Sequence, residues 1–460
     1  MPFLSFAIDG RRAFVCLIEA ALIAAMFWGS HRVLGYSMWS ETSFDGVFHQ
    51  AIIPTALIFA AIVACGGYQP DVQSQSSEMA QRVALGAVSG GLLVLIISLV
   101  FFQHDRPAAP LVVGIALSIA SLIALRLTFT RIRFDVFENR VAVLGAGERA
   151  ARLTSALPGG ARDRIVGYIA NSADRTMAAP SGALIAGKEG EGLAERLRRQ
   201  HVRELIVALD DRRSGAFPTK ELIDCRMRGI VVSDVNSYIE RETGKVDLDD
   251  LYPSWLIFSP GFKTGVARDV IKRASDIFFS VLLLVLFMPV LIVTALLVKL
   301  ESPGPVFYLQ TRVGKDGKPF KLFKFRSMRS DAEKDGAVWA RKNDDRVTRV
   351  GRVIRKIRID EIPQAINVLR GEMSFVGPRP ERPEFVEMLS KEIDLYEERH
   401  RVKPGITGWA QVRYPYGASV EDAREKLKYD LFYMKNYSAV FDISIILQTV
   451  RVMLFALGGR

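Results

Sequence analysis

Long apolar runs separated by short polar segments fill the first third of this chain of 460 residues. Four of these runs are close to the ~20 residues that a helix needs to cross a bilayer. They cover residues 13–29, 47–65, 83–102 and 111–130. We therefore predict a bundle of four transmembrane helices within residues 1–135. The alternative, four helices buried in a soluble core, would need a partner surface covering segments with almost no charge.

The pattern changes between residues 136 and 255, where short apolar segments alternate with charged ones. The apolar segments are residues 141–144, 165–170, 205–209 and 230–232. Such alternation predicts a small parallel α/β domain. The first segment leads into Gly145-Ala146-Gly147, a dinucleotide-type turn in which Ala150 replaces the third glycine. Asn171 stands where an acid would bind ribose, so we predict a Rossmann-like domain with a structural or oligomerising role rather than an NAD site.

A fifth apolar run covers residues 277–298 and contains Met288-Pro289 near its middle. Lys272 and Arg273 precede this run, and Lys299 follows it. Proline interrupts the helical hydrogen bonds. A helix that enters one leaflet, bends at Pro289 and returns would keep both cationic ends on one side. We predict such a re-entrant helix at the start of a third domain, residues 265–460; a kinked helix that crosses the membrane is the alternative.

The third domain contains two further patterns. Residues 320–328 alternate bases with apolar residues after the turn Gly314-Lys315-Asp316-Gly317, which predicts a hairpin. One face of its second strand would be buried and the other would meet phosphate, or would simply be solvated. Residues 441–457 are largely apolar and predict a helix lying on the membrane, with a core helix as the alternative.

Two adjacent acids, Asp360 and Glu361, follow a row of arginines at every third position. The row comprises Arg346, Arg349, Arg352, Arg355 and Arg358. This spacing predicts a helix with one cationic face, and Pro363 and Gly371 predict the start and stop of the next helix. The acids would then lie near a positive helix end, where phosphate or a metal could meet both. The alternative is a charged helix followed by two ordinary capping acids.

Composition fits membrane segments joined to a soluble enzyme, because 49% of residues are hydrophobic while 24% are charged. The net charge of +11 indicates an anionic partner, which nucleic acid, lipid headgroups and phosphorylated substrates would all satisfy. Cys16, Cys65 and Cys225 have neither disulfide nor zinc spacing, so a reducing, cytosol-facing location is expected.

Charge placement predicts the orientation of the four-helix bundle. Arg11 and Arg12 precede the first apolar run, and four arginines close or follow the fourth run. These four are Arg126, Arg131, Arg133 and Arg140. The positive-inside rule then places both ends of the bundle in the cytoplasm. A cleaved signal peptide is not expected, because Glu19 interrupts the first run.

Five ordered motifs in the last 190 or so residues resemble the bacterial sugar transferase family, the polyprenyl-phosphate hexose-1-phosphate transferases. They are Lys272-Arg273 with Asp276, Lys324-Phe325-Arg326-Ser327-Met328, Asp360-Glu361-Ile362-Pro363-Gln364, Gly377-Pro378-Arg379-Pro380 and Lys403-Pro404-Gly405-Ile406-Thr407-Gly408. The four helices and the Rossmann-like domain also resemble the long form of this family.

The resemblance implies transfer of a sugar 1-phosphate from a UDP-sugar to undecaprenyl phosphate in the bacterial inner membrane, at its cytoplasmic face. Asp360 would be the nucleophile, UMP would leave, and Glu361 would hold Mg²⁺. The substrate-binding candidates are Arg355, Arg379, Arg326, Lys324 and Arg358. No nucleic acid partner is implied, and a homodimer is compatible with the pattern.

One segment departs from the family pattern. Many members continue after Ala410-Gln411-Val412 with an Asn-Gly segment, whereas this chain has Arg413-Tyr414-Pro415-Tyr416-Gly417. The transferred hexose is therefore not predicted. Two other functions fit parts of the sequence: a membrane-anchored nucleotide-sugar dehydratase or epimerase, and a non-enzymatic scaffold. The first usually needs a tyrosine four residues before a lysine, a spacing that the chain lacks.

Overall fold

The computed structural model divides the chain into two compact units, Met1–Asp250 and Leu251–Arg460, and each is described by itself. Within them the structure describes residues 10–34, 51–67, 76–101, 108–131, 140–172, 174, 178, 184–187, 190–211, 217–248, 261–262, 265–329, 346–415, 417 and 419–454.

Four apolar helices lie in the first part of the chain: α2 (Gly10–Val33), α4 (Ile53–Ala64), α5 (Ser76–Phe101) and α6 (Ala108–Arg131). Helices α2, α5 and α6 are long and apolar enough to cross a membrane. Helix α4 has only 12 residues, and the first residues of the predicted second span, 47–50, lie outside the described residues.

Close backbone packing and a buried ion pair join these helices. A Cβ added to Gly86 of α5 would lie 2.5 Å from the Cα of Ile62 on α4, so glycine permits the approach. Glu19 of α2 pairs with Arg126 of α6, with Nη2 3.1 Å from Oε2, and both side chains are buried. The sequence pattern places Arg126 among the flanking cations, but it lies inside the bundle, where a buried charge needs a partner.

A four-stranded parallel sheet follows, in the order β2-β1-β3-β4. Its strands are β1 (Val141–Leu144), β2 (Ile165–Ile169), β3 (Glu204–Val207) and β4 (Val231–Asp234). One face packs against α7 (Glu148–Ala156) and α11 (Val235–Thr243), and the other packs against α9 (Leu193–Arg199) and α10 (Thr219–Met227). A short helix, α8 (Gly159–Arg162), precedes β2.

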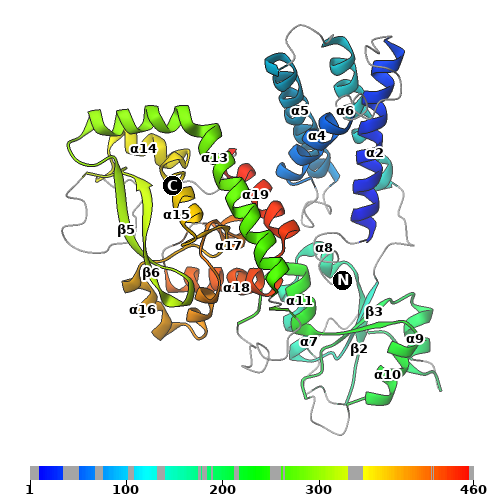
Figure 1. Cartoon of the computed structure of the whole chain (residues 1–460). Coiled ribbons are helices and arrows are strands. Elements are labelled where there is room, and N and C mark those ends of the chain that lie inside the picture. The colour runs from blue at the N-terminus through cyan, green and yellow to red at the C-terminus, as the bar shows by residue number, and fades with distance from the viewer. Residues whose placement is uncertain are drawn as a thin grey trace. The chain divides into compact units, whose positions relative to one another are not determined.

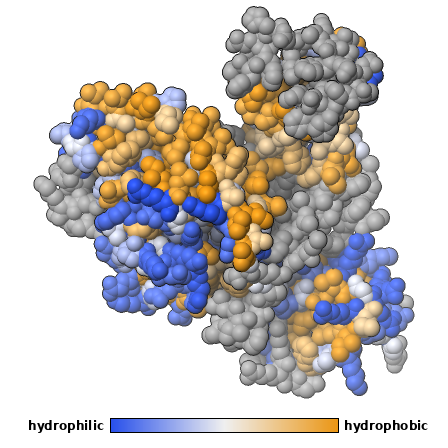
Figure 2. All heavy atoms as spheres, in the orientation of Figure 1, coloured by the Kyte–Doolittle hydropathy of each residue, from blue (hydrophilic) through white to orange (hydrophobic). Residues whose placement is uncertain are grey.

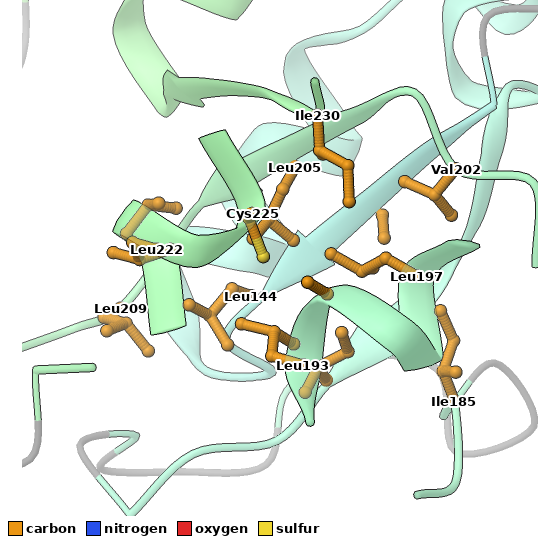
Figure 3. Close-up of a cluster of buried hydrophobic side chains, with 14 residues drawn as sticks. Leu144, Ile185, Leu193, Leu197, Val202, Leu205, Leu209, Leu222, Cys225 and Ile230 are labelled. Carbon is orange, nitrogen blue, oxygen red and sulfur yellow. The ribbon is translucent and has the colours of Figure 1, made fainter. Parts of the chain in front are cut away.

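Alternating side chains of the strands explain this sandwich. In β1, Leu144 points to the α9/α10 face and Val143 to the other. Figure 3 shows Leu197 of α9 and Cys225 of α10 packed around Leu144 and Leu205. The predicted parallel α/β arrangement is thus present, with strands beginning within one residue of the expected segments.

The second unit begins with α13 (Val266–Glu301), a helix of 36 residues that contains Pro289. Figure 1 shows that α13 is sharply bent, with two arms. In the first arm, Arg273 donates to the carbonyls of Val368 and Leu369 at 2.6 and 2.8 Å. At the other end, the Glu301 carboxylate accepts from the amide of Arg349 at 2.7 Å. Both ends of α13 are therefore anchored on the same compact unit.

The rest of this unit surrounds a hairpin and a second small sheet. Strands β5 (Phe307–Val313) and β6 (Pro319–Phe325) pair antiparallel across the turn η4 (Lys315–Gly317), which confirms the predicted hairpin. Strands β7 (Ser374–Val376) and β8 (Gly405–Thr407) pair in parallel. The remaining helices are α14 (Arg349–Lys356), η5 (Ile359–Glu361), α15 (Gln364–Arg370), α16 (Pro383–Glu392), η6 (Tyr396–Arg401), α17 (Trp409–Arg413), α18 (Val420–Asn436) and α19 (Ala439–Leu454).

The exposed side chains of α13 form an apolar surface. Figure 2 shows this hydrophobic cap above a hydrophilic body, and Val285 and Leu286 are 63% and 68% exposed. So much exposed apolar area marks a membrane or protein contact. Helix α19 has features of both a membrane-surface helix and a core helix. Ile445 is buried in the unit, whereas Val440 is 64% exposed.

Candidate active site

Asp360 and Glu361 lie in the short turn η5, between α14 and α15. Helix α14 ends at Lys356, and Arg358 adopts a left-handed conformation with φ 59° and ψ 17°. For a residue other than glycine this conformation costs roughly 1–3 kcal/mol, which the surrounding structure must offset. The predicted cationic helix is thus shorter than the arginine row, and Arg346 and Arg358 lie outside it.

The predicted ends of the next helix are confirmed. Pro363 is the N-cap of α15, and Gly371 is its left-handed C-cap with φ 84°. Both acids therefore immediately precede a helix N-terminus and are buried, at 8% and 9% exposure. Burial of two adjacent carboxylates requires compensating cations.

Three cations from different parts of the chain surround Glu361. Arg379 donates from Nη2 to Oε1 at 2.7 Å, and Lys324 Nζ lies 3.4 Å from the same oxygen. Arg358 Nη1 is 3.6 Å from it. Burial opposes ionisation, but Arg379, Lys324 and Arg358 together hold the pKa of Glu361 well below its usual range. Glu361 is therefore ionised at neutral pH.

The pKa of Asp360 is shifted in the opposite direction. Burial, followed by the negative charge of Glu361, raises the pKa of Asp360 to about 6, against the opposing effects of Lys324, Arg358 and Arg355. A carboxylate that is ionised at neutral pH, yet poorly solvated, suits a nucleophile. Burial also lowers the pKa of Lys324 to about 8, although Glu361 raises it.

The seven candidate residues named from the sequence are not all in the same place. Lys324, Arg358 and Arg379 converge on Glu361, and Arg355 is close enough to influence Asp360. Arg326 is engaged elsewhere: its guanidinium donates to the carbonyl of Pro303 at 2.9 Å and to that of Ser302 at 2.8 Å. These contacts indicate that Arg326 supports the loop after α13, and a role in substrate binding stays a prediction.

The donor set limits how a metal could bind. Among the residues that the structure describes, no group of three or more His, Cys, Asp or Glu side chains could hold an ion. Mg²⁺ is commonly held by one or two carboxylates together with water and substrate phosphates, rather than by a protein cage. Asp360 and Glu361 fit a site of this kind, which the phosphates of a substrate would complete.

The segment that departs from the family pattern is tied to neighbouring elements. The Arg413 guanidinium lies 4.8 Å from the ring centroid of Trp409, and the Tyr414 hydroxyl donates to Asp422 at 3.0 Å. Asp422 belongs to the N-terminal capping box of α18. The single cation of this segment, Arg413, is thus stacked on an aromatic ring.

A buried pair that the sequence analysis missed lies behind Arg379. Arg399 of η6 forms an ion pair with Asp430 of α18 at 2.8 Å, and both are buried. Arg399 also donates to the backbone carbonyl of Arg379 at 2.9 Å. In the sequence, Arg399 lies within a run of charges that is typical of a solvated surface, so no local signal distinguished it.

The glycine turn of the α/β domain is closed by the chain's own carboxylates. Asp210 accepts from the amide of Arg149 at 3.0 Å and from that of Glu148 at 3.3 Å, at the N-terminus of α7. Asp174 accepts from the amide of Ala146 at 3.0 Å. These amides are the groups that would hold a dinucleotide pyrophosphate. A pyrophosphate could use them only by displacing both carboxylates.

The similarity to known proteins is most complete in the second unit. A family model described as bacterial sugar transferase matches residues 267–456, which include η5, Lys324 and Arg379. The UDP-N-acetylgalactosamine-undecaprenyl-phosphate N-acetylgalactosaminephosphotransferase of Aeromonas hydrophila is 44% identical over 254 residues, 55% of this chain and 58% of that protein. The UDP-glucose:undecaprenyl-phosphate glucose-1-phosphate transferase of Escherichia coli K12 is 48% identical over 189 residues, 41% of this chain and 40% of that protein.

A third relative is matched over nearly its whole length. The exopolysaccharide production protein PSS of Rhizobium leguminosarum bv. phaseoli is 46% identical over 187 residues, 39% of this chain and 94% of that protein. The matches to the first two relatives span only about half of their lengths. An almost complete match to a relative at this identity, together with the matching family model, shows that the chain belongs to the bacterial sugar transferase family.

Proposed function

We propose that the protein transfers a sugar 1-phosphate from a UDP-sugar to undecaprenyl phosphate and releases UMP, as the first membrane step of exopolysaccharide or O-antigen assembly. The observation that carries this proposal is the buried Asp360, which lies beside an ionised Glu361 and a cluster of cations. Both substrates carry phosphate, and the cluster supplies the positive charge that phosphoryl transfer requires.

The reaction would take two displacement steps at one phosphorus. A carboxylate oxygen of Asp360 attacks the phosphorus that bears the sugar, the bond from that phosphorus to the bridging oxygen breaks, and UMP leaves with that oxygen. An oxygen of the lipid phosphate then attacks the same phosphorus and releases the Asp360 carboxylate. The acyl phosphate formed between these steps splits one difficult transfer into two easier ones.

The other residues act by charge and position. Arg379, Lys324 and Arg358 would stabilise charge that develops on the phosphoryl oxygens, and Arg355 would add a fourth cation near Asp360. Glu361 would hold these cations in place and provide a ligand for Mg²⁺. Mg²⁺, when bound, would neutralise phosphate charge on the donor.

The shape of α13 supports a re-entrant helix. A straight helix of this length would be ~54 Å long, more than a bilayer core. However, its first arm is anchored through Arg273 on α15 and its end through Glu301 on α14, within one compact unit. Both ends would then lie on the cytoplasmic face of the inner membrane, with Pro289 near the deepest point. This arrangement would bring Asp360 level with the phosphate of a lipid that cannot leave the bilayer.

Experiment must identify the transferred sugar, because the relatives from Aeromonas hydrophila and Escherichia coli K12 carry names with different UDP-sugars. A direct test is to incubate the protein in nanodiscs with undecaprenyl phosphate and a panel of UDP-sugars, and to measure UMP. We expect one sugar, or a narrow group, to give UMP together with a lipid-linked product. Asp394→Asn, a change at an exposed acid, is the matched control for Asp360→Asn.

The same assay separates the alternative functions. A dehydratase or epimerase would change the UDP-sugar without releasing UMP, and a scaffold would leave it intact. Loss of the donor without UMP, or no turnover of any donor in the panel, would contradict the proposal.

A further inference from the structure

Arg379 reaches Glu361 from a loop whose backbone is held at successive residues. The carbonyl of Pro378 accepts from the amide of Gly405 at 2.8 Å, and that of Glu381 accepts from the amide of Val313 at 2.9 Å. Between them, the carbonyl of Arg379 accepts from the Arg399 side chain at 2.9 Å. The loop is thus fixed from both sides of the residue that contacts Glu361.

The sequence of the loop explains why side chains take part. Pro378 and Pro380 flank Arg379 and have no backbone N–H, so at these positions only carbonyl oxygens are available for hydrogen bonds. Two arginines, the buried Arg399 and the half-buried Arg312, supply donors to consecutive carbonyls: Arg399 to that of Arg379, and Arg312 to that of Pro380 at 3.1 Å. A guanidinium can serve several acceptors at once.

Arg399 is in turn held in a single orientation. Its Nη1 donates to the hydroxyl of Tyr396 at 2.7 Å, and its Nη2 forms the ion pair with Asp430 at 2.8 Å. Arg399 and Asp430 are only 6% and 2% exposed, so each carries a charge that the other must compensate. Neither residue contacts Asp360 or Glu361 among the contacts that the structure describes.

We propose that Arg399 and Asp430 are positioning residues for the transfer reaction: Asp430 orients Arg399, Arg399 fixes the backbone of Arg379, and Arg379 thereby meets Glu361 and the phosphates. This inference rests on the proposed function for its kinetic part. Misplacement of a phosphate-binding group by about 1 Å can lower turnover by roughly a hundredfold. Arg399 would act in this way without touching the substrate.

The test removes the buried pair as a unit, so that no unpaired charge is left inside the fold. The variant is Arg399→Gln with Asp430→Asn, and its matched control is Arg241→Gln with Glu204→Gln, which removes the ion pair at 2.7 Å in the α/β domain. Both changes are also made in an Arg379→Lys background. The readouts are kcat and KM for UMP release, with hydrogen exchange of the peptide covering residues 377–382.

We expect the first variant to lower kcat by about ten- to a hundredfold with a smaller effect on KM, and the control to leave both unchanged. In the Arg379→Lys background the same change should cost less than about threefold, since the residue being positioned is already altered. Equal losses in both backgrounds would overturn the proposal.

Hydrogen exchange decides the question if turnover in the Arg379→Lys background is too slow to measure. Faster exchange confined to residues 377–382 supports positioning, whereas unchanged exchange there overturns it. If the unaltered protein releases no UMP from any donor, the proposed function fails, and the exchange result still reports on the loop. The two failures are therefore distinguishable.

Discussion

Asp360 and Glu361 are adjacent in one turn, yet the pKa values of their carboxyl groups are shifted in opposite directions. Three cations converge on Glu361 and hold its pKa low, while burial and the charge of Glu361 raise the pKa of Asp360 to about 6. Neighbouring acids whose pKa values are driven apart usually have different tasks in a mechanism. The geometry therefore favours Asp360 as the group that reacts and Glu361 as the group that organises charge.

Substitution of the two acids should give different losses. Asp360→Asn should abolish UMP release while membrane insertion stays intact, because the amide is not a nucleophile at phosphorus. Glu361→Gln should retain weak transfer with a higher Mg²⁺ requirement, since the amide is a poorer metal ligand. Mg²⁺ titrations of UMP release, with Asp394→Asn as the control, measure both effects. Normal turnover by Asp360→Asn would remove the proposed nucleophile, and an unchanged Mg²⁺ titration of Glu361→Gln would remove the proposed ligand.

The pH profile of kcat/KM should be bell-shaped. Transfer requires ionised Asp360, so the rate should fall as pH drops below about 6, and it should fall again above about 8 as Lys324 loses its proton. Lys324→Arg should remove the alkaline limb, because arginine stays charged. Glu361→Gln should move the acid limb to lower pH, since the neighbouring negative charge raises the pKa of Asp360. A profile that is flat from pH 5 to pH 9 would contradict these assignments.

Much of the active-site region follows from local sequence patterns. The hairpin of β5 and β6, the start of α15 after Pro363 and its stop at Gly371 all depend on residues within a few positions of each other. The short apolar segment at residues 141–144, set between charged segments, also located β1 correctly. Local chemistry dictates these features, so they can be predicted without a structure.

Other features depend on residues far apart in the chain, and the sequence did not reveal them. The spacing of the arginines alone predicts a cationic helix that continues to Arg358. In the structure, the backbone of Arg358 is left-handed and η5 begins after it. From the sequence, Glu19 is an interruption of an apolar run and Arg126 is a flanking charge, but in the structure the two form a buried ion pair. Arg399 was likewise not distinguished from surface arginines. Pairings of this kind are set by tertiary packing, which periodicity does not describe.

The reactive carboxylate should reduce the stability of the fold. The pKa of Asp360 is about 6 in the folded protein and 3.8 in its reference state, so the folded state favours the protonated acid. The stability contributed by that proton is present below pH 4 and is lost as pH rises through 6. Asp360→Asn should therefore raise the thermal midpoint at pH 7.5, by a margin that shrinks toward pH 5. A lower midpoint at pH 7.5, with the Asp394→Asn control unchanged, would show that burial of the ionised Asp360 carboxylate does not destabilise the fold.

The bend in α13 has a consequence for topology. With the native cysteines replaced by serine, Val266→Cys lies at the first residue of α13 and Lys315→Cys lies after the helix, and both positions are exposed. If α13 re-enters, an impermeant thiol reagent should label both positions from the cytoplasmic side of oriented vesicles and neither from the other side. Cysteines that react from opposite sides would indicate a crossing helix. Leu286→Cys, near the bend, should resist the reagent from either side.

The α/β domain should not bind NAD at its glycine turn, because Asp210 and Asp174 already accept hydrogen bonds from the amides that a pyrophosphate would use. Millimolar NAD should leave the thermal midpoint of the protein unchanged. Asp210→Ala should instead lower the stability of this domain by about 1 kcal/mol, the usual cost of losing a helix cap, without affecting UMP release. Hydrogen exchange of the α7 peptide measures this loss. The control is Asp224→Ala, a change at a half-exposed acid of the same domain that pairs with Arg228 and lies outside the glycine turn. A rise in the midpoint with NAD would mean that the carboxylates move aside for a ligand, and the domain would then be a nucleotide sensor rather than a structural module.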